Sequence, residues 1–198
     1  MNQKQVNRII KLLKEKGILF GKGLSDDEIF RVNQEFGIRF PNDLKLLLQT
    51  EIPINNGFVN WRYGINCENG KKEIDYYLNW PMEGMLFDIK NNSFWHDKWG
   101  IKPSEFEKQK LIALKELDKQ PKLIPIYSHR YISSEPNEIG NPVFSVYQMD
   151  IIYYGVDLMD YFSKEFRFEL PKSYGIITEP KQIQFWSDIV DLNNKSFE

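Results

Sequence analysis

Residues 123–155 read LIPIYSHRYISSEPNEIGNPVFSVYQMDIIYYG and carry the clearest strand pattern in the chain. The runs LIPI, PVFSVY and DIIYYG are short and rich in β-branched and aromatic residues, which is typical of strands. The strands and a shaped loop are bounded by Pro125, Pro136, Gly140 and Pro142, because proline restricts φ and glycine permits turns. This region therefore predicts short strands joined by turns.

Upstream of these strands, the first fifty residues predict three short helices. An apolar face with i, i+3, i+4, i+7 spacing ends before Gly17, and residues 1–20 are read as an N-terminal helix and a flexible connector. In LSDDEI, Ser25 and Glu28 form a capping box that begins a second helix. In FPNDLKLLL, Pro41 suits a first turn, and the buried face carries Leu44, Leu47 and Leu48.

The remaining segments complete the prediction of an α+β fold. Residues 58–89 follow NNG and contain aromatic pieces broken by ENG and EGM, which predicts strands and the start of the sheet. Helices are predicted over 105–120, 156–167 and 181–190. This order lacks regular βαβ alternation, so we expect one domain over residues 1–198. Its central sheet is twisted and mostly antiparallel, with helices packed on one face and at its ends.

Composition and charge narrow the class of partner. The 198 residues are 41% hydrophobic and 27% charged, with a net charge of −2, so no overall positive field favours direct nucleic-acid binding. Residues 131–170 are different, because they carry a net charge of −5. Any charged partner is therefore expected to be basic. The acidic residues of this segment are Glu135, Glu138, Asp150, Asp157, Asp160, Glu165 and Glu169.

The compartment is predicted from cysteine use and hydropathy. Cys67 is the single cysteine and cannot form an internal disulfide, and MNQKQVNRII lacks the apolar run of a signal peptide. No apolar stretch approaches the roughly 20 residues that a membrane helix needs. We therefore expect a cytoplasmic protein without a membrane span, and the oligomeric state stays open.

No catalytic, metal or cofactor motif emerges from the sequence. His96 and His129 are the only histidines, and with one cysteine they do not form a zinc pattern. GILFGKGLS departs from a phosphate-binding loop in spacing and lacks the Ser or Thr after its lysine. We expect a non-enzymatic protein without cofactor. One alternative stays open, in which His129 beside Arg130 acts as a general base instead of a hydrogen-bonded turn residue.

Aromatic clusters with arginine are candidates for partner binding, because Trp, Tyr and Arg are enriched at interface hot spots. Core packing is the alternative interpretation of the same residues. Together with the acidic segment, the clusters give ten candidate partner-binding residues: Trp61, Arg62, Tyr63, His129, Arg130, Tyr131, Glu135, Glu138, Asp157 and Asp160.

The order of motifs resembles the SUKH superfamily, in particular its Smi/Knr-like branch. The resemblance runs from about Ser25 to Phe166 through FPNDLKLLL, Trp61, FWHDKWG, LIPIYSHRYI and GNPVFSVYQMDIIYYGVDLMDYF. One departure is Ser133–Ser134, where relatives tend to have a proline, and it leaves the shape of the following loop open.

This resemblance implies an α+β fold and a binding role. Many bacterial members are immunity proteins that bind and neutralise polymorphic toxins, often nucleases or deaminases. Fungal relatives look like regulators of cell-wall synthesis. We therefore expect an immunity protein that binds a basic toxin domain. An intracellular regulator or scaffold, and an enzyme using His129, are the alternatives.

Overall fold

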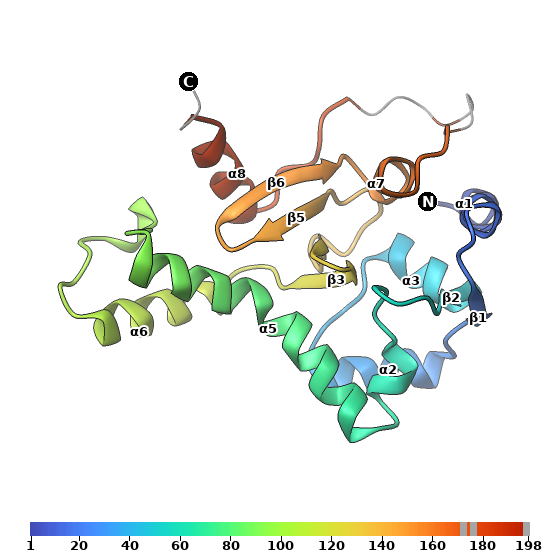
Figure 1. Ribbon diagram of the computed structural model, residues 1–198, viewed down its shortest axis with the longest axis horizontal. Coiled ribbons are helices and arrows are strands. Elements are labelled where there is room, and N and C mark those ends of the chain that lie inside the picture. Colours follow the sequence, from blue (N-terminus) through green and yellow to red (C-terminus); the bar gives the residue numbers. More distant parts are fainter. Residues whose placement is uncertain (171–173, 175–177, 196–198) are drawn as a thin grey trace.

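The computed structural model describes residues 1–170, 174 and 178–195 (Figure 1). The helices are α1 (Gln3–Glu15), α2 (Asp26–Phe36), α3 (Asn42–Thr50), α4 (Trp61–Gly64), α5 (Glu68–Asn91), α6 (Phe106–Leu117), α7 (Leu158–Phe166) and α8 (Trp186–Lys195), with a short 3-10 helix at Asp97–Trp99. The strands are β1 (Phe20–Lys22), β2 (Glu51–Pro53), β3 (Leu123–Tyr127), β4 (Arg130–Ser133), β5 (Val143–Tyr147) and β6 (Asp150–Gly155). The predicted α+β class is confirmed.

The main sheet is an antiparallel meander in the order β3-β4-β5-β6. Strands β3, β5 and β6 lie in the predicted runs, whereas β4 occupies residues that the sequence analysis did not assign to a strand. Two-residue turns join β3 to β4 and β5 to β6, and each contains a residue with left-handed φ, Ser128 (50°) or Gln148 (55°). A second sheet pairs β1 with β2, so the predicted flexible connector after α1 instead ends in a paired strand. All strand pairings among the described residues are antiparallel.

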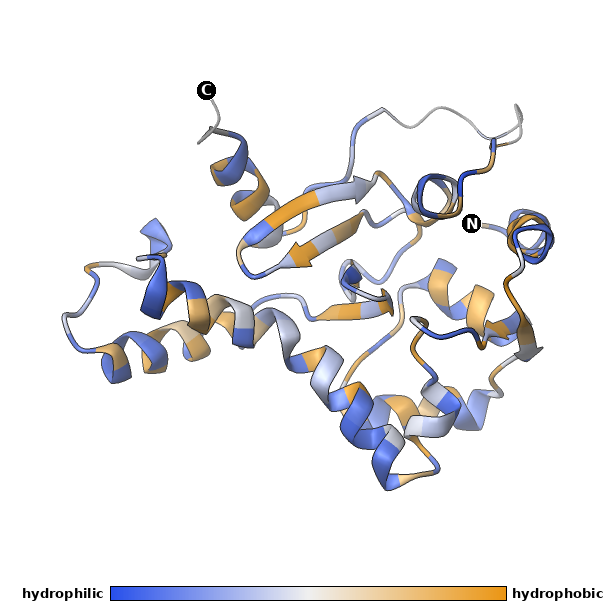
Figure 2. Cartoon of the chain, viewed as in Figure 1, coloured by the Kyte–Doolittle hydropathy of each residue, from blue (hydrophilic) through white to orange (hydrophobic). Residues whose placement is uncertain are grey.

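The main sheet buries side chains on both faces, beyond the one face expected. One face packs against α1, α2, α3 and α7, and its strands contribute Ile124, Ile132 and Val143. The other face packs against α8 and the C-terminal half of α5, and its strands contribute Tyr131, Phe144 and Ile151. Figure 2 shows hydrophobic residues gathered where helices meet strands. The sheet thus lies between two hydrophobic cores, one on each of its faces.

The predicted helix signals near the N-terminus are confirmed. The Glu28 amide donates to Ser25 Oγ (3.2 Å), and the Ser25 amide donates to Glu28 Oε2 (2.8 Å), which completes the capping box of α2. Leu44, Leu47 and Leu48 are buried on α3. The last helix begins later than predicted, at Trp186, because Phe185 adopts a left-handed φ of 68° that interrupts helical geometry.

The prediction of strands over residues 58–89 is wrong, because α4 and the long helix α5 occupy this region. The buried residues Ile74, Pro81 and Met85 follow helical spacing on α5, with Pro81 inside the helix. Gly84, which looked like a turn residue, is needed because a Cβ there would lie 2.7 Å from Gln148 Cα. Proline and glycine usually indicate turns or helix ends, but Pro81 and Gly84 lie inside α5, where they pack against other parts of the chain.

The structure compensates for the proline inside α5. Proline has no backbone N–H, so the carbonyl of Tyr77, four residues before Pro81, loses its helical donor. The Tyr131 hydroxyl of β4 donates to this carbonyl at 2.9 Å. Burial raises the pKa of Tyr131, so the hydroxyl keeps its proton over a wide pH range. Tyr131 therefore connects the sheet to the interrupted turn of α5.

Candidate protein-binding face

Three of the predicted partner-binding residues are buried. The Trp61 ring packs edge-on against Phe36 and Phe40, with ring centroids 6.2 and 5.0 Å apart. Tyr131 is fully buried, and Asp157 caps α7 by accepting the Asp160 amide at 2.9 Å. The expectation that these side chains serve as exposed anchors is corrected. Aromatic composition alone does not separate a core tryptophan from an interface tryptophan.

Arg62 joins α4 to α2 instead of facing solvent. Its guanidinium forms an ion pair with Glu28 and donates to the carbonyls of Lys22 (2.7 Å) and Gly23 (2.8 Å). The hydrogen bond from Arg62 lowers the pKa of Glu28 to about 2. Tyr63 remains exposed beside Cys67, and its hydroxyl hydrogen bond lowers the pKa of that thiol. Of this predicted cluster, only Tyr63 faces solvent.

Arg130 is fully engaged within the fold. Its Nε donates to Glu165 Oε2 (2.9 Å), its Nη1 donates to Ser145 Oγ (2.8 Å), and its guanidinium lies 3.7 Å from the centroid of the Tyr154 ring. These contacts tie β4, β5, β6 and α7 together. The side chain is held in place and mostly shielded from solvent.

His129 occupies the two-residue turn between β3 and β4. Its Nδ1 lies 3.2 Å from Ser128 Oγ, and burial together with the positive charge of Arg130 lowers the pKa of its imidazole. The hollows described below do not include His129 among their lining residues. These contacts fit the turn interpretation of this histidine.

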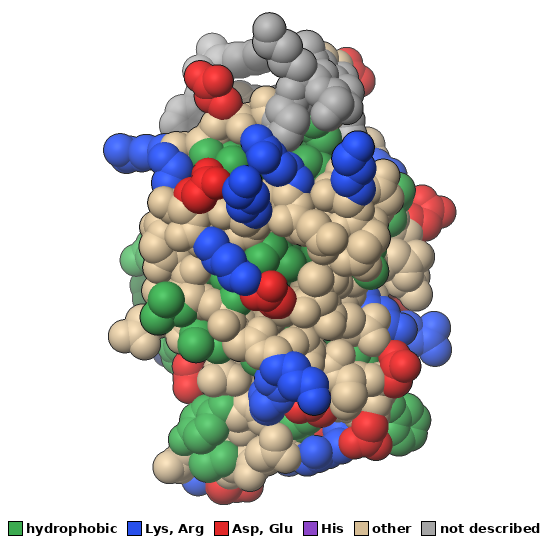
Figure 3. Space-filling view, turned by 90° about the vertical axis from the view of Figure 1, so that its right-hand side faces the viewer, with side chains coloured by type: hydrophobic (Ala, Val, Ile, Leu, Met, Phe, Trp, Pro, Cys, Tyr) green, Lys and Arg blue, Asp and Glu red, His purple; other side chains and the backbone are tan. Residues whose placement is uncertain are grey.

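The acidic residues of segment 131–170 do not form one acidic face. Glu138 pairs with Lys181 (3.1 Å), Asp160 pairs with Lys164 (2.7 Å), and Glu165 is bound by Arg130. Glu135 remains exposed in the loop that contains the cis Glu135–Pro136 bond. Figure 3 shows positive and negative side chains interspersed over the face that lies to the right in Figure 1. Three of the seven acidic residues of the segment thus have a positively charged partner, so the negative charge of the segment is compensated only in part.

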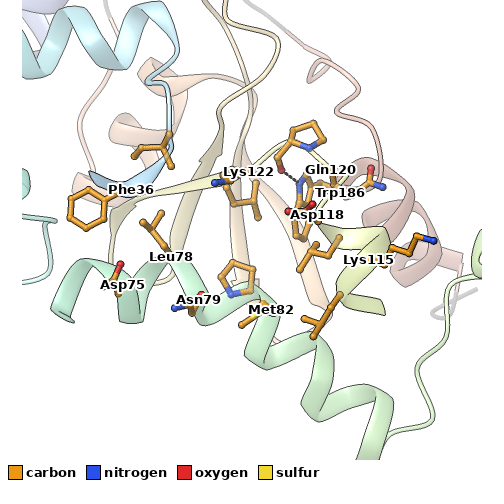
Figure 4. Close-up of a pocket in the computed structure, with 16 residues that line it drawn as sticks. Phe36, Asp75, Leu78, Asn79, Met82, Lys115, Asp118, Gln120, Lys122 and Trp186 are labelled. Carbon is orange, nitrogen blue, oxygen red and sulfur yellow. Dashed lines mark hydrogen bonds between the residues drawn. The ribbon is translucent and has the colours of Figure 1, made fainter. Parts of the chain in front are cut away.

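An open hollow of about 610 Å³ lies between α5, the C-terminal half of α6 and residues 120–123 (Figure 4). Leu78 and Met82 of α5 and Leu114 of α6 contribute apolar side chains. Trp186 of α8 closes one end, where its Nε1 donates to the Pro121 carbonyl at 2.7 Å. The full lining is Phe36, Ile38, Asp75, Leu78, Asn79, Pro81, Met82, Leu114, Lys115, Leu117, Asp118, Gln120, Pro121, Lys122, Leu123 and Trp186.

A second, more polar hollow of about 400 Å³ adjoins the first. The two share Ile38, Gln120 and Lys122 among other residues, and the second adds Arg39 and Glu135. Lys122 Nζ donates to the Gly37 carbonyl at 3.1 Å, which holds its charge between the two hollows. An apolar depression with a polar extension is a common form of binding site.

The described lining of the larger hollow contains no Ser, Cys or His, and its ionisable side chains are those of Asp75, Lys115, Asp118 and Lys122. Over residues 1–170, 174 and 178–195, no group of three His, Cys, Asp or Glu side chains could hold a metal ion. In the same part of the chain, no helix has the length and hydropathy needed to cross a membrane.

Sequence reasoning missed this hollow because four separate segments form it. Residues 58–89, which include Leu78 and Met82, were predicted to form strands, and residues 105–120 were predicted only as a helix. A helical apolar period in residues 74–85 was the signal that could have placed Leu78 beside α6.

Comparison with protein-family models finds no match to this chain. Comparisons with curated proteins and with solved structures find no match either. The site is therefore interpreted from its own geometry.

Proposed function

We propose that this protein is a cytoplasmic, non-enzymatic immunity protein that neutralises a toxin domain of the nuclease or deaminase type by direct binding. The observation that carries the proposal is the open hollow of about 610 Å³, with apolar walls and charged residues at its rim. Interface hot spots are large side chains that fill such depressions on a partner. The resemblance of the motif order to Smi/Knr-like proteins supports the same proposal.

The lining of the hollow supports binding of a protein partner. Asp75, Lys115 and Asp118 carry charges in the lining, while Leu78 and Leu114 contribute apolar surface. This arrangement suits one or two apolar side chains of a protein partner, inserted at the centre and surrounded by polar contacts. A bound toxin would lose access to its substrate because standard interfaces cover on the order of 800 Å² of each partner.

The test pairs two substitutions on α6. Leu114→Arg places a charge in the hollow, whereas Leu111→Arg makes the same change at a side chain that is 69% exposed and outside the lining. Both variants and the unmodified protein are coexpressed with nuclease and deaminase toxin domains from the same genome. Cell survival and calorimetric affinity are measured, and thermal unfolding verifies that each variant folds.

We expect the unmodified protein and Leu111→Arg to protect cells, and Leu114→Arg to bind its toxin at least tenfold more weakly. Equal protection by both variants would contradict the role of the hollow. Protection against none of the toxin domains would contradict the immunity function itself, and retention of wall-synthesis proteins from a lysate would favour the regulator alternative.

A further inference from the structure

Aromatic residues form a line along α5 and continue onto β5, and all but the partly buried Trp80 are exposed. Tyr76, Trp80 and Phe87 are spaced i, i+4, i+11, which places them on one face of the helix. The Trp80 ring centroid lies 5.7 Å from that of Tyr76 and 6.4 Å from that of Tyr147 on β5. Tyr76, Phe87 and Tyr147 are 58%, 49% and 60% exposed. We refer to Tyr76, Trp80, Phe87 and Tyr147 as the aromatic ridge.

The two elements that carry the aromatic ridge are held firmly together. Trp80 Nε1 donates to the Val146 carbonyl at 3.2 Å, and Asp88 Oδ2 accepts the Met149 amide at 2.8 Å. Gly84 allows the β5–β6 turn to approach the helix backbone closely. The ridge is therefore positioned before any partner binds, which reduces the entropy cost of binding.

Uncompensated acidic side chains border the aromatic ridge. Glu83 lies on the same helical face between Trp80 and Phe87, and Asp150 is the cross-strand neighbour of Tyr147. Both carboxylates are exposed, and neither forms an ion pair with a residue in the described part of the chain. Aromatic faces and free carboxylates both attract cations.

The lysines of α5 form no ion pair with Glu83 or Asp150 in the described part of the chain. Lys72 lies 3.9 Å from Glu68, and Lys90 Nζ lies 5.5 Å from the Phe106 ring centroid, on the side of α6. The ridge therefore combines π faces with negative charge, in contrast to the mixed-charge face of Figure 3.

We propose that the aromatic ridge binds an arginine-bearing segment of the protein partner. A planar guanidinium stacks on Tyr or Trp rings and pairs with a carboxylate at the same time, which an ammonium group does less well. The fold already contains this arrangement, since Arg130 lies over the Tyr154 ring while it is bound by Glu165. The identity of the partner as a toxin rests on the proposed function, whereas the arginine preference rests on the ridge.

A capped peptide, acetyl-Gly-Arg-Gly-Arg-Gly-amide, tests this preference directly. Its affinity is measured by NMR titration of the labelled protein, beside peptides in which citrulline or lysine replaces both arginines. We expect the citrulline peptide to bind at least tenfold more weakly and the lysine peptide severalfold more weakly. Added salt should weaken arginine binding, because exposed charges are screened. Equal binding of the citrulline peptide, or no binding of the arginine peptide, would overturn the inference.

Variants locate the binding surface. The double substitution Tyr76→Ala with Tyr147→Ala should weaken arginine-peptide binding at least tenfold, and Glu83→Gln with Asp150→Asn should reduce its salt dependence. The matched control is Phe30→Ala on α2, because Phe30 is also 60% exposed and lies outside the ridge. An equal loss in the Phe30 variant, or chemical-shift changes away from α5 and β5, would contradict the assignment.

The two proposals fail separately. If a toxin is neutralised and the ridge variants neutralise it as well as the unmodified protein, the ridge inference fails and the immunity function stands. If no toxin is neutralised but the arginine peptide binds at the ridge, the immunity function fails and the arginine-binding surface stands.

Discussion

The β3–β6 sheet and helix α5 are held in place by different kinds of contact. Each strand of the sheet pairs with its neighbour in sequence, and two-residue turns connect β3 to β4 and β5 to β6. Helix α5 instead depends on distant partners. The Tyr77 carbonyl is bound by Tyr131, 54 residues away, and Asp88 accepts the Met149 amide, 61 residues away. The sheet is organised by local contacts and α5 by tertiary contacts.

This difference shows where proline and glycine do not indicate a turn. In the hairpins, Gly140 and the turn residues keep their ordinary role at bends. In α5, Pro81 lies in the buried stripe and Gly84 lies under the β5–β6 turn. Both are poor helix formers, so packing against the sheet outweighs helix propensity at these positions.

The largest expected effect tests the sheet. Phe144 is fully buried on β5 and stacks on Tyr153 with centroids 5.3 Å apart, so Phe144→Ala should destabilise the protein by about 3–5 kcal/mol through lost burial and a cavity. Chemical denaturation measures the change. Tyr147→Ala on the same strand is the control and should change stability by less than about 0.5 kcal/mol. A small loss of stability on Phe144→Ala would contradict the placement of Phe144 in the core between the sheet, α5 and α8.

The next effect tests the contact between α5 and the hairpin. Gly84→Ala should stabilise the protein by about 1 kcal/mol through the higher helix propensity of alanine. The Cβ of the alanine, however, would lie 2.7 Å from Gln148 Cα. Because backbone atoms must move, we expect a net loss of about 1–3 kcal/mol. Asn79→Ala, an exposed position on the same helix, should be neutral or slightly stabilising. Stabilisation by Gly84→Ala would show that α5 does not need this close contact.

A pH effect tests the ion pair between Arg62 and Glu28, which connects α2 to α4, the short helix that precedes α5. Arg62 lowers the pKa of Glu28 to about 2 from 4.5, so this pair contributes stability above pH 4.5 that is lost as the pH falls toward 2. Glu28→Gln should cost about 1–2 kcal/mol at pH 7 and should flatten the decline in unfolding free energy between pH 4.5 and 2. Glu73→Gln, at an exposed position, should leave the profile unchanged.

The smallest effect tests the hydrogen bond from Tyr131 to the carbonyl that Pro81 leaves without a helical donor. Tyr131→Phe leaves the Tyr77 carbonyl without its donor and should cost about 1 kcal/mol. In a Pro81→Ala background, the new backbone N–H can bind that carbonyl, so the same substitution should cost less. A double-mutant cycle measures this coupling. Equal losses of stability in both backgrounds would show that the Tyr131 hydroxyl does not compensate for the missing N–H of Pro81.

The predictable part of the fold consists of segments whose pattern agrees with their structure. Ser25 and Glu28 form the expected capping box, and both Leu44 and Leu47 are buried as expected. Residues 58–89 were misread because their helical period is interrupted by Pro81 and Gly84. At the binding face, neither the hollow nor the aromatic ridge was predicted, since their residues were assigned to strands or to the core.

The amino-acid sequence by itself determined the α+β class, the strands β3, β5 and β6 and the N-terminal helices, because caps, turns and apolar periods act within a few residues. Only the tertiary structure decided that Trp61 and Tyr131 are buried while Tyr76 and Tyr147 are exposed. An aromatic side chain has the same composition in a core and at an interface. Which of the two it occupies depends on the elements that cover it, and in this chain those elements come from distant parts of the sequence.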